Sequence, residues 1–159
     1  MKNFTPCLWF DHQAEEAATF YTALFPNSHI VHIALFGKAE AQASGRPLGS
    51  VMTVAFELDG HDFLALNGGP AFTLSPATSF FVACQTQQEI DRYWDAFADG
   101  DRTMECGWVT DRFGVSWQVV PAQLGEWMQD PATCERVMAA LITMQKLDLP
   151  TLQRAAHAV

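Results

Sequence analysis

The stretch CGWVTDRFGVSWQVVP, residues 106–121, places one polar amide, that of Gln118, within a run of apolar residues. The pattern predicts two short strands joined by a tight turn at 111–114. If Ser116, Gln118 and Val120 share one face of the second strand, the Gln118 amide faces the space that the sheet encloses. It is then either a hydrogen-bonding group for a small ligand or a buried amide bonded to a neighbour. Both alternatives require a partner, because an unpaired buried amide costs about 1–3 kcal/mol.

Other residue types that could bind a ligand lie in neighbouring predicted strands. Ser79 opens the strand SFFVAC on the same face as Phe81, without the GxSxG context of a nucleophile. Asn67 precedes two glycines and is either a strand-end residue or a pocket residue. Cys106 is expected on a short strand, as a structural thiol or a pocket-lining one, since a reactive thiolate needs a neighbouring cation. The aromatic rings of Phe81 and Trp108 suit flat ligands. The predicted ligand-binding residues are therefore Asn67, Ser79, Phe81, Cys106, Trp108 and Gln118.

The five histidines are not predicted to form a catalytic or metal-binding set. His29 and His32 are three residues apart on a predicted strand, and this odd separation places them on opposite faces of a regular strand. No catalytic residue is therefore assigned.

A repeated series of elements positions the candidate residues. The order strand, helix, strand, strand, strand is predicted twice, in a first module at about 4–69 and a second at about 78–121. The two predicted helices match at an offset of 73 residues. Because one helix covers only one face of a small sheet, the repeat predicts a cleft lined by both modules. The matched helix positions are Ala17 and Ile90, Tyr21 and Trp94, and Leu24 and Phe97.

Local signals place the ends of these elements. Asp11 is expected to cap the first helix and Thr86 the second, which Gly100 ends. The segment 38–50 is small and polar and predicts a mobile loop, with a short helical turn as the alternative. The pair Asp59–Gly60 predicts the turn of a hairpin.

A helical tail, 131–157, follows the second module. Pro131 suits a first helical turn, and a second short helix is predicted after Pro150. The apolar stripe of the first tail helix either packs into the core or covers a subunit interface. Its residues are Cys134, Val137, Met138, Leu141 and Met144.

Composition limits the partners of the protein. Its 159 residues carry a formal net charge of -9, which argues against nucleic acid and anionic membranes as partners. No apolar run is long enough to span a membrane, and no signal peptide is apparent. The four cysteines lie far apart without a CxxC pair, so we expect free, mostly buried thiols and a cytoplasmic location.

The chain resembles the PhnB-like family in the segments LWFDHQAEEAATFYTALFPNS, LNGGPAF, EIDRYWDAF, CGWVTDRFGVSWQVVP and RVMAALITMQKLDLPTL. This family belongs to the glyoxalase/bleomycin-resistance/dioxygenase, or vicinal oxygen chelate, superfamily, and some members are labelled 3-demethylubiquinone-9 3-methyltransferase. The resemblance extends from about Phe4 to Leu152. It implies an α+β fold of tandem βαβββ modules that form a barrel-like cleft, with a C-terminal helix and commonly a homodimer.

In metal-using relatives, the resemblance implies one ligand from the first strand and one from the last strand of each module. The matching positions here are Pro6, Ala65 (or Asn67 in a shifted register), Ser79 and Gln118. Pro and Ala cannot bind a metal, and one Ser with one Gln is a weak, neutral donor set.

The expected function is therefore small-molecule binding in an apolar and aromatic cleft, with no metal and no cofactor. The alternative is a metal-assisted isomerase, lyase or dioxygenase whose ligands are not identified in the sequence. A methyltransferase is disfavoured, because neither predicted strand-to-helix turn, DHQAEEA or TQQEID, is rich in glycine as S-adenosylmethionine binding requires.

Overall fold

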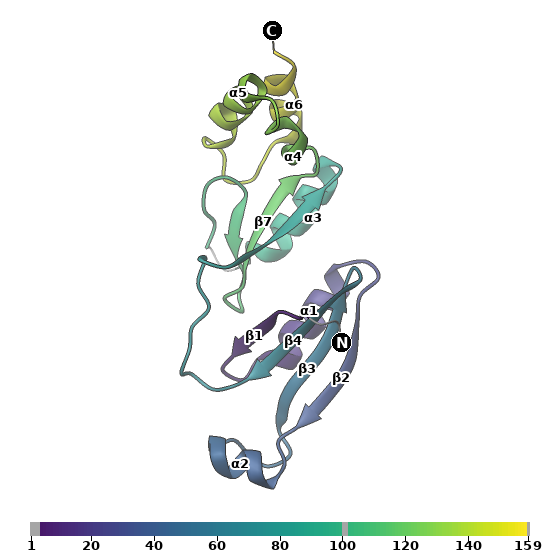
Figure 1. Ribbon diagram of the computed structural model, residues 1–159, viewed down its shortest axis with the longest axis vertical. Helices are drawn as coiled ribbons and strands as arrows, with labels where there is room; N and C mark the ends of the chain where they lie inside the picture. Colours follow the sequence, from purple (N-terminus) through teal and green to yellow (C-terminus); the bar gives the residue numbers. More distant parts are fainter. Residues whose placement is uncertain (1–3, 100–101, 159) are drawn as a thin grey trace. The chain divides into compact units, whose positions relative to one another are not determined.

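Each half of the chain folds into a small sheet with a helix packed on it (Figure 1). The computed structural model describes residues 4–99 and 102–158, and the chain divides into two compact units, Met1–Leu74 and Ser75–Val159. Both sheets are open-edged and neither closes into a barrel. The α+β class, the paired modules and the helical C-terminus predicted from the sequence are confirmed.

Unit one contains a four-stranded sheet in the order β1-β4-β3-β2, in which β1 runs parallel to β4 and the other neighbours are antiparallel. The β3–β4 hairpin turns at Asp59 and Gly60, both with positive φ, as the Asp–Gly pair predicts. The elements are β1 (Cys7–Phe10), α1 (Ala14–Leu24), β2 (His29–Leu35), α2 (Lys38–Ser44), β3 (Val51–Leu58) and β4 (His61–Asn67).

Helix α1 covers one face of this sheet. Its buried Tyr21 stacks on Phe56 of β3, with ring centroids 6.4 Å apart. Because strand residues alternate between faces, the buried residues Val54, Phe56 and Ala65 point to the helix. The alternate residues of β1, β3 and β4 therefore form an open face on the opposite side of the sheet.

The start of α1 differs from the prediction. Gln13, not Asp11, precedes the helix, and its side chain makes no capping hydrogen bond. The Oδ1 atom of Asn67, at the end of β4, instead accepts from the backbone N–H of Ala14 at 2.8 Å. Asp11 pairs with Arg46, whose Nη2 lies 2.7 Å from its carboxylate. The side-chain amide of Asn67, which is distant in the sequence, thus caps the helix in place of the local residue expected from the sequence.

The edge strand β2 contains an irregularity that changes the placement of two histidines. His29 pairs with Glu57 and His32 with Ala55, because one extra residue is accommodated between Ile30 and His32. Glu57 and Ala55 share a face of β3, so the two histidines lie on the same side of the sheet. The prediction of opposite faces, which assumed a regular strand, is wrong.

Unit two contains a three-stranded sheet in the order β5-β7-β6, with β5 parallel to β7 and β6 antiparallel to it. Where a fourth strand was expected, the described part of the segment forms a single bridge, between Thr103 and Val109. The elements are β5 (Ser79–Cys84), α3 (Gln87–Phe97), β6 (Trp108–Thr110), β7 (Ser116–Pro121), α4 (Leu124–Trp127), α5 (Pro131–Leu141) and α6 (Leu149–His157).

Helix α3 agrees closely with its sequence pattern. Thr86 caps it by accepting from the N–H of Glu89 at 3.2 Å. Phe97 stacks on Trp117 of β7, with centroids 4.6 Å apart and planes 3° from parallel. Gly100, expected to end the helix, lies outside the described residues. The buried helix residues are those predicted from the 3.6-residue period: Ile90, Tyr93, Trp94 and Phe97.

The turn between β6 and β7 is built around the buried carboxylate of Asp111, whose residue is 1% exposed. This carboxylate accepts from the N–H groups of Phe113 and Val115 at 2.9 and 3.0 Å, and from the indole Nε1–H of Trp117 at 2.8 Å. The N–H of Gly114 donates to the Asp111 carbonyl at 3.0 Å and closes the turn. The predicted turn at 111–114 is confirmed.

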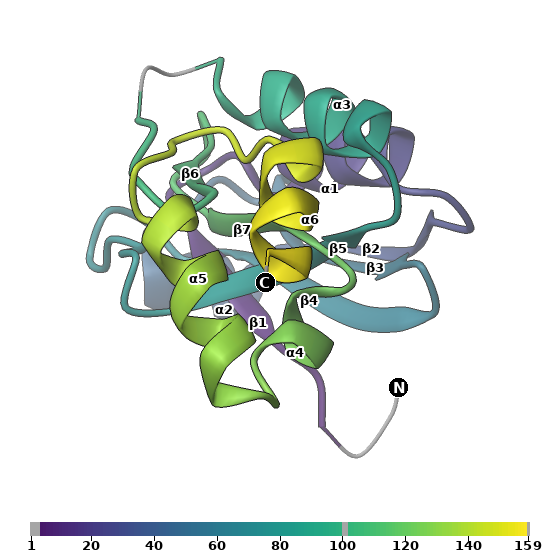
Figure 2. The same ribbon diagram turned by 90° about the horizontal axis from the view of Figure 1, so that it is seen from above.

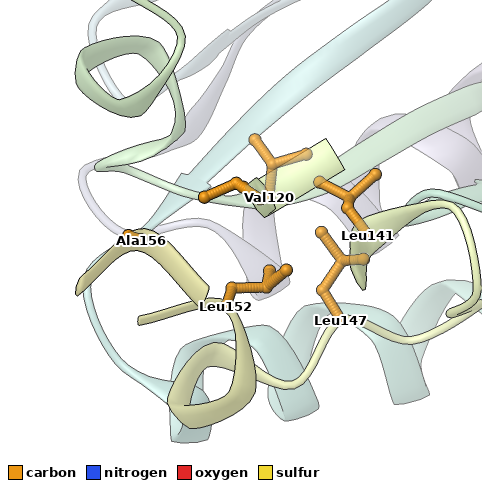
Figure 3. Packing of buried hydrophobic residues seen from close by; sticks show 6 residues of the cluster. Val120, Leu141, Leu147, Leu152 and Ala156 are labelled. Atoms are coloured by element: carbon orange, nitrogen blue, oxygen red, sulfur yellow. The ribbon is translucent and has the colours of Figure 1, made fainter. Parts of the chain in front are cut away.

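The C-terminal helices belong to unit two and pack on the end of β7. Figure 3 shows Val120 of β7 facing Leu141, Leu147 and Leu152. Helices α5 and α6 lie side by side (Figures 1 and 2), and Arg136 of α5 donates to carbonyls at the end of α6. The tail is thus part of a hydrophobic core, as one of the two alternatives predicted.

Two details of the tail and the thiols differ from expectation. Of the predicted stripe of α5, only Val137 and Leu141 are buried, and Met144 lies beyond the end of the helix. The four cysteines are free, but among them only Cys84 is buried, while Cys7 is exposed. The expectation of mostly buried thiols is therefore wrong.

We expect Asp111→Asn to destabilise unit two, because an amide of the same shape can no longer accept from all three N–H donors. The expected loss is about 1–3 kcal/mol of unfolding free energy, measured by urea denaturation. The control is Asp99→Asn, since Asp99 forms an exposed ion pair with Arg112 and its substitution should change stability by less than about 1 kcal/mol. Equal stability of the two variants would contradict the role given to the buried carboxylate.

Candidate functional site

The open face of the β5-β7-β6 sheet brings together four of the six candidate residues. In the ladder, Phe81 lies opposite Gln118, and Gln118 lies opposite Trp108. Trp117 points to α3, so Gln118, its neighbour, points to the other side of the sheet. Ser79 shares that side with Phe81. The strand alternation used in the sequence prediction therefore places Ser79, Phe81, Trp108 and Gln118 on one surface.

Gln118 and Ser79 form a polar pair on this surface. The Nε2 atom of Gln118 donates to the Oγ of Ser79 at 2.8 Å. The Ser79 hydroxyl hydrogen and the Gln118 Oε1 have no protein partner among the described residues. Both side chains are half-buried, so the pair presents one free donor and one free acceptor side by side.

Aromatic and small polar groups surround the pair. The Phe81 side chain is 66% exposed, and Trp108 is half-buried. The buried hydroxyls of Thr110 and Ser116 bond to each other at 3.0 Å further along the same face. At the other end, Val120 is covered by the C-terminal helices. The accessible part of the face is therefore an aromatic surface with a single hydrogen-bonding pair.

Asn67 does not share this arrangement. It lies on the helix-facing side of β4 in unit one and is 6% exposed. Its Oδ1 accepts from Ala14, and its Nδ2 donates to the carbonyl of Val51 at 3.0 Å. These bonds join α1, β3 and β4, which accounts for a buried amide at this position without a ligand.

Cys106 occupies a turn before β6 rather than a strand. Its φ is 65°, and its N–H donates to the carbonyl of Met144 at 2.7 Å. The side chain packs against the C-terminal core that includes Val120 and Leu147. Cys84 is the most shielded thiol, and burial raises its pKa to about 12, so it does not form a reactive thiolate near neutral pH.

The equivalent face of unit one can be aligned through the backbone. The N–H of Gly68 donates to the Phe10 carbonyl at 2.9 Å, and the N–H of Ala122 donates to the Cys84 carbonyl at 2.8 Å. The first strands therefore correspond at an offset of 74, while the helices, which start at Ala14 and Gln87, keep the offset of 73. One fewer residue separates strand from helix in unit two.

This one-residue difference changes which residues of unit one correspond to Ser79 and Gln118. The counterpart of Ser79 is Thr5, not Pro6, and the counterpart of Gln118 is Leu64, not Ala65. The Oγ1 of Thr5 is buried and has no hydrogen-bond partner in the part of the chain that the structure describes. The sequence prediction does not include Thr5, because the helix offset of 73 differs by one residue from the strand offset of 74.

Among residues 4–99 and 102–158, no three His, Cys, Asp or Glu side chains are grouped so that they could hold a metal ion. No helix in these same ranges is both long and apolar enough to cross a bilayer.

Comparisons with known proteins agree with this architecture. A PhnB protein from Bacillus cereus, provisionally assigned as a 3-demethylubiquinone-9 3-methyltransferase, is 32% identical in sequence to this chain. The structural alignment of the two includes 76% of this chain and 100% of the Bacillus cereus chain, with a TM-score of 0.65. The Pseudomonas aeruginosa protein PA1353 is 22% identical, with coverages of 75% and 96% and a TM-score of 0.56, which shows the fold. No curated protein matches the chain.

The family model described as 3-demethylubiquinone-9 3-methyltransferase matches residues 2–120. The match includes both modules and ends before α4, so the tail that the resemblance included lies outside it. The chain therefore belongs to the 3-demethylubiquinone-9 3-methyltransferase-like, or PhnB, family.

Proposed function

We propose that the protein binds a small organic molecule on the open face of the β5-β7-β6 sheet, without a metal. The observation that carries the proposal is the Ser79–Gln118 pair, which keeps one donor and one acceptor free beside the exposed ring of Phe81. Ligand sites typically combine apolar and aromatic walls with a few placed polar groups. A flat molecule with an adjacent donor and acceptor, such as an aromatic amide or phenol, matches this surface.

The donor chemistry does not suit the metal-assisted alternative. The four positions implied by the superfamily correspond to Thr5, Leu64, Ser79 and Gln118 once the strand offset is corrected. Three are neutral oxygen donors at most and one is a hydrocarbon, whereas Zn, Ni and Fe sites use imidazole, thiolate or carboxylate ligands. These residues do not fit a divalent transition metal, so no step of the proposed function passes through one.

The methyltransferase in the family description is not part of the proposal. The strand-to-helix connections, residues 11–13 and 85–86, contain no glycine, although a glycine-rich turn at this place is what binds S-adenosylmethionine in the common fold. Both sheets also contain antiparallel neighbours instead of an all-parallel arrangement. The cleft lined by both modules, the homodimer and the cytoplasmic location stay predictions.

Binding can be tested with Gln118→Leu, a substitution that removes the amide and keeps an apolar side chain of similar size. Titration calorimetry would use 4-hydroxybenzamide, benzamide, phenol and toluene as probes. We expect the polar probes to bind more tightly than toluene. The variant should weaken their binding about two- to tenfold, the effect of one neutral hydrogen bond. Gln88→Leu on the exposed side of α3 is the control and should change nothing.

Three outcomes would contradict the proposal. The first is equal affinity of wild type and Gln118→Leu for every probe, and the second is no binding of any probe. The third is stoichiometric binding of Ni(II), Zn(II), Mn(II) or Fe(II) with a thermal shift, which would support the metal-assisted enzyme.

The unpaired hydroxyl of Thr5 gives a separate prediction. We expect Thr5→Val to leave the unfolding free energy unchanged or to raise it, because the substitution removes a buried hydroxyl that has no partner among residues 4–99 and 102–158. Thr110→Val is the matched variant; it should lose about 1–3 kcal/mol, since it leaves the buried Ser116 hydroxyl unpaired. Urea denaturation of both variants measures the difference. A loss in Thr5→Val as large as in Thr110→Val would show that Thr5 is paired.

A further inference from the structure

Unit one contains a cavity of about 310 Å³ beside the first turn of α1, on a different part of the chain from the Ser79–Gln118 pair. Its apolar lining comes from Phe36, Pro47 and Val51, and its polar lining includes His12, Glu15 and Arg46. This volume is at the lower end of the range typical of small-molecule sites.

The segment between β2 and β3 forms one wall of the cavity. In unit two the equivalent connection, between the bridge at Thr103 and β6, spans only residues 104–107. In unit one, the segment is held at its base by two backbone hydrogen bonds of 2.8 Å, from Phe36 to Ser50 and from Gly49 to Phe36. This longer segment is thus a feature of unit one that unit two lacks, and backbone hydrogen bonds fix its two ends to each other beside the sheet.

Arg46 fixes the same wall to the start of α1. Its Nη2 donates to the carboxylate of Asp11 at 2.7 Å and also to the Asp11 carbonyl. Hydrogen bonding to this guanidinium lowers the pKa of Asp11. The pair therefore holds the wall of the cavity against the start of α1.

The hydrogen bonds of the lining amide and hydroxyl are already used within the protein. Asn67 bonds to Ala14 and Val51, and the hydroxyl of Ser50 donates to the carbonyl of Pro47 at 2.7 Å. The selectivity of the cavity must therefore come from its charged groups and its apolar floor.

The charged lining residues include one carboxylate, that of Glu15, which lies in the first turn of α1 outside any described ion pair. Arg46 is neutralised by Asp11, and His12 approaches the other oxygen of the same carboxylate at 3.3 Å. Glu15 forms no ion pair with any described residue, and its exposed side chain lines the cavity. Together with the net charge of -9, this favours a positively charged ligand.

The apolar floor specifies the rest of that ligand. Phe36 is buried, at 6% exposed, and lines the cavity together with Val51 and Pro47. Removing an apolar body from water against these groups provides affinity that a small hydrated cation such as Na⁺ lacks. We propose that this cavity binds an organic ammonium ion, with the ammonium at Glu15 and an apolar body on Phe36, Pro47 and Val51.

The corresponding place in unit two shows that such a space can be filled. Beside the first turn of α3, the side chain of Gln87 donates to the Leu147 carbonyl at 3.1 Å and accepts from the N–H of Leu149 at 2.7 Å. The chain's own tail therefore occupies the region next to that helix, whereas in unit one the region next to α1 is a cavity.

The test uses benzylamine as the cationic probe and benzyl alcohol as its neutral analogue, with binding followed by amide chemical shifts in two-dimensional NMR. We expect benzylamine to bind more tightly than benzyl alcohol and to shift the amides of Gly49 and Val51. Glu15→Gln should weaken benzylamine binding about two- to fivefold, as expected for one partly exposed ion pair, and leave benzyl alcohol unaffected.

Glu16→Gln is the matched control, because Glu16 is also exposed in the first turn of α1 but does not line the cavity. Both variants remove one negative charge from the same helix end. If both weaken benzylamine binding equally, the effect comes from the overall charge of the helix end and not from the cavity, and the proposal is overturned. Absence of benzylamine binding at millimolar concentration would overturn it as well. Gln118→Leu should not change benzylamine affinity; if it does, the probe binds at the other face and the cavity proposal is wrong.

Discussion

The buried carboxylate of Asp111 is the interaction on which the geometry of unit two depends. A charge removed from water is tolerated only when donors surround it, and three N–H groups from Phe113, Val115 and Trp117 do so here. Two of the donors shape the turn, and the third fixes the indole of Trp117, which also stacks on Phe97. The side of the sheet that Trp117 faces is thereby determined.

The placement of Gln118 follows from that constraint. In a strand, neighbouring side chains point to opposite faces, so an anchored Trp117 directs Gln118 and Ser116 away from α3. A shift of the β6–β7 register by one residue would exchange these roles. The same logic applies in unit one, where the contact of Tyr21 with Phe56 fixes the helix-facing residues and leaves Thr5 and Leu64 on the other side.

Much of this arrangement is predictable from the sequence, because it is encoded in local patterns. The 3.6-residue period gives the buried side of α3, the Asp59–Gly60 pair gives the hairpin, and Thr86 gives the helix cap. Ser79, Phe81, Trp108 and Gln118 share a surface through simple strand alternation. Membership of the PhnB family is likewise predictable from sequence segments such as LWFDHQAEEAATFYTALFPNS and CGWVTDRFGVSWQVVP.

The remaining features depend on contacts between distant residues or on single-residue irregularities. Asp11 has the residue type of a helix cap, but it pairs with Arg46, and Asn67 takes its place from another strand. The extra residue in β2 places His29 and His32 on one side, and no local signal marks it. A shorter strand-to-helix connection in unit two displaces the strand offset by one, which concealed Thr5. One extra or missing residue of this kind shifts the alignment of a strand, and the residue types around it give no sign of the shift.

The participation of the C-terminal helices in the core of unit two has a consequence for synthesis on the ribosome. All strands of unit one are complete at Asn67, so its sheet can assemble while the rest of the chain is still being made. Unit two places Val120 against Leu147 and Leu152, residues that are translated about thirty positions later. Until those residues emerge, the end of β7 has an uncovered apolar edge. During synthesis, the second half of the chain therefore exposes apolar surface that can misfold or bind a chaperone until its last helices are translated.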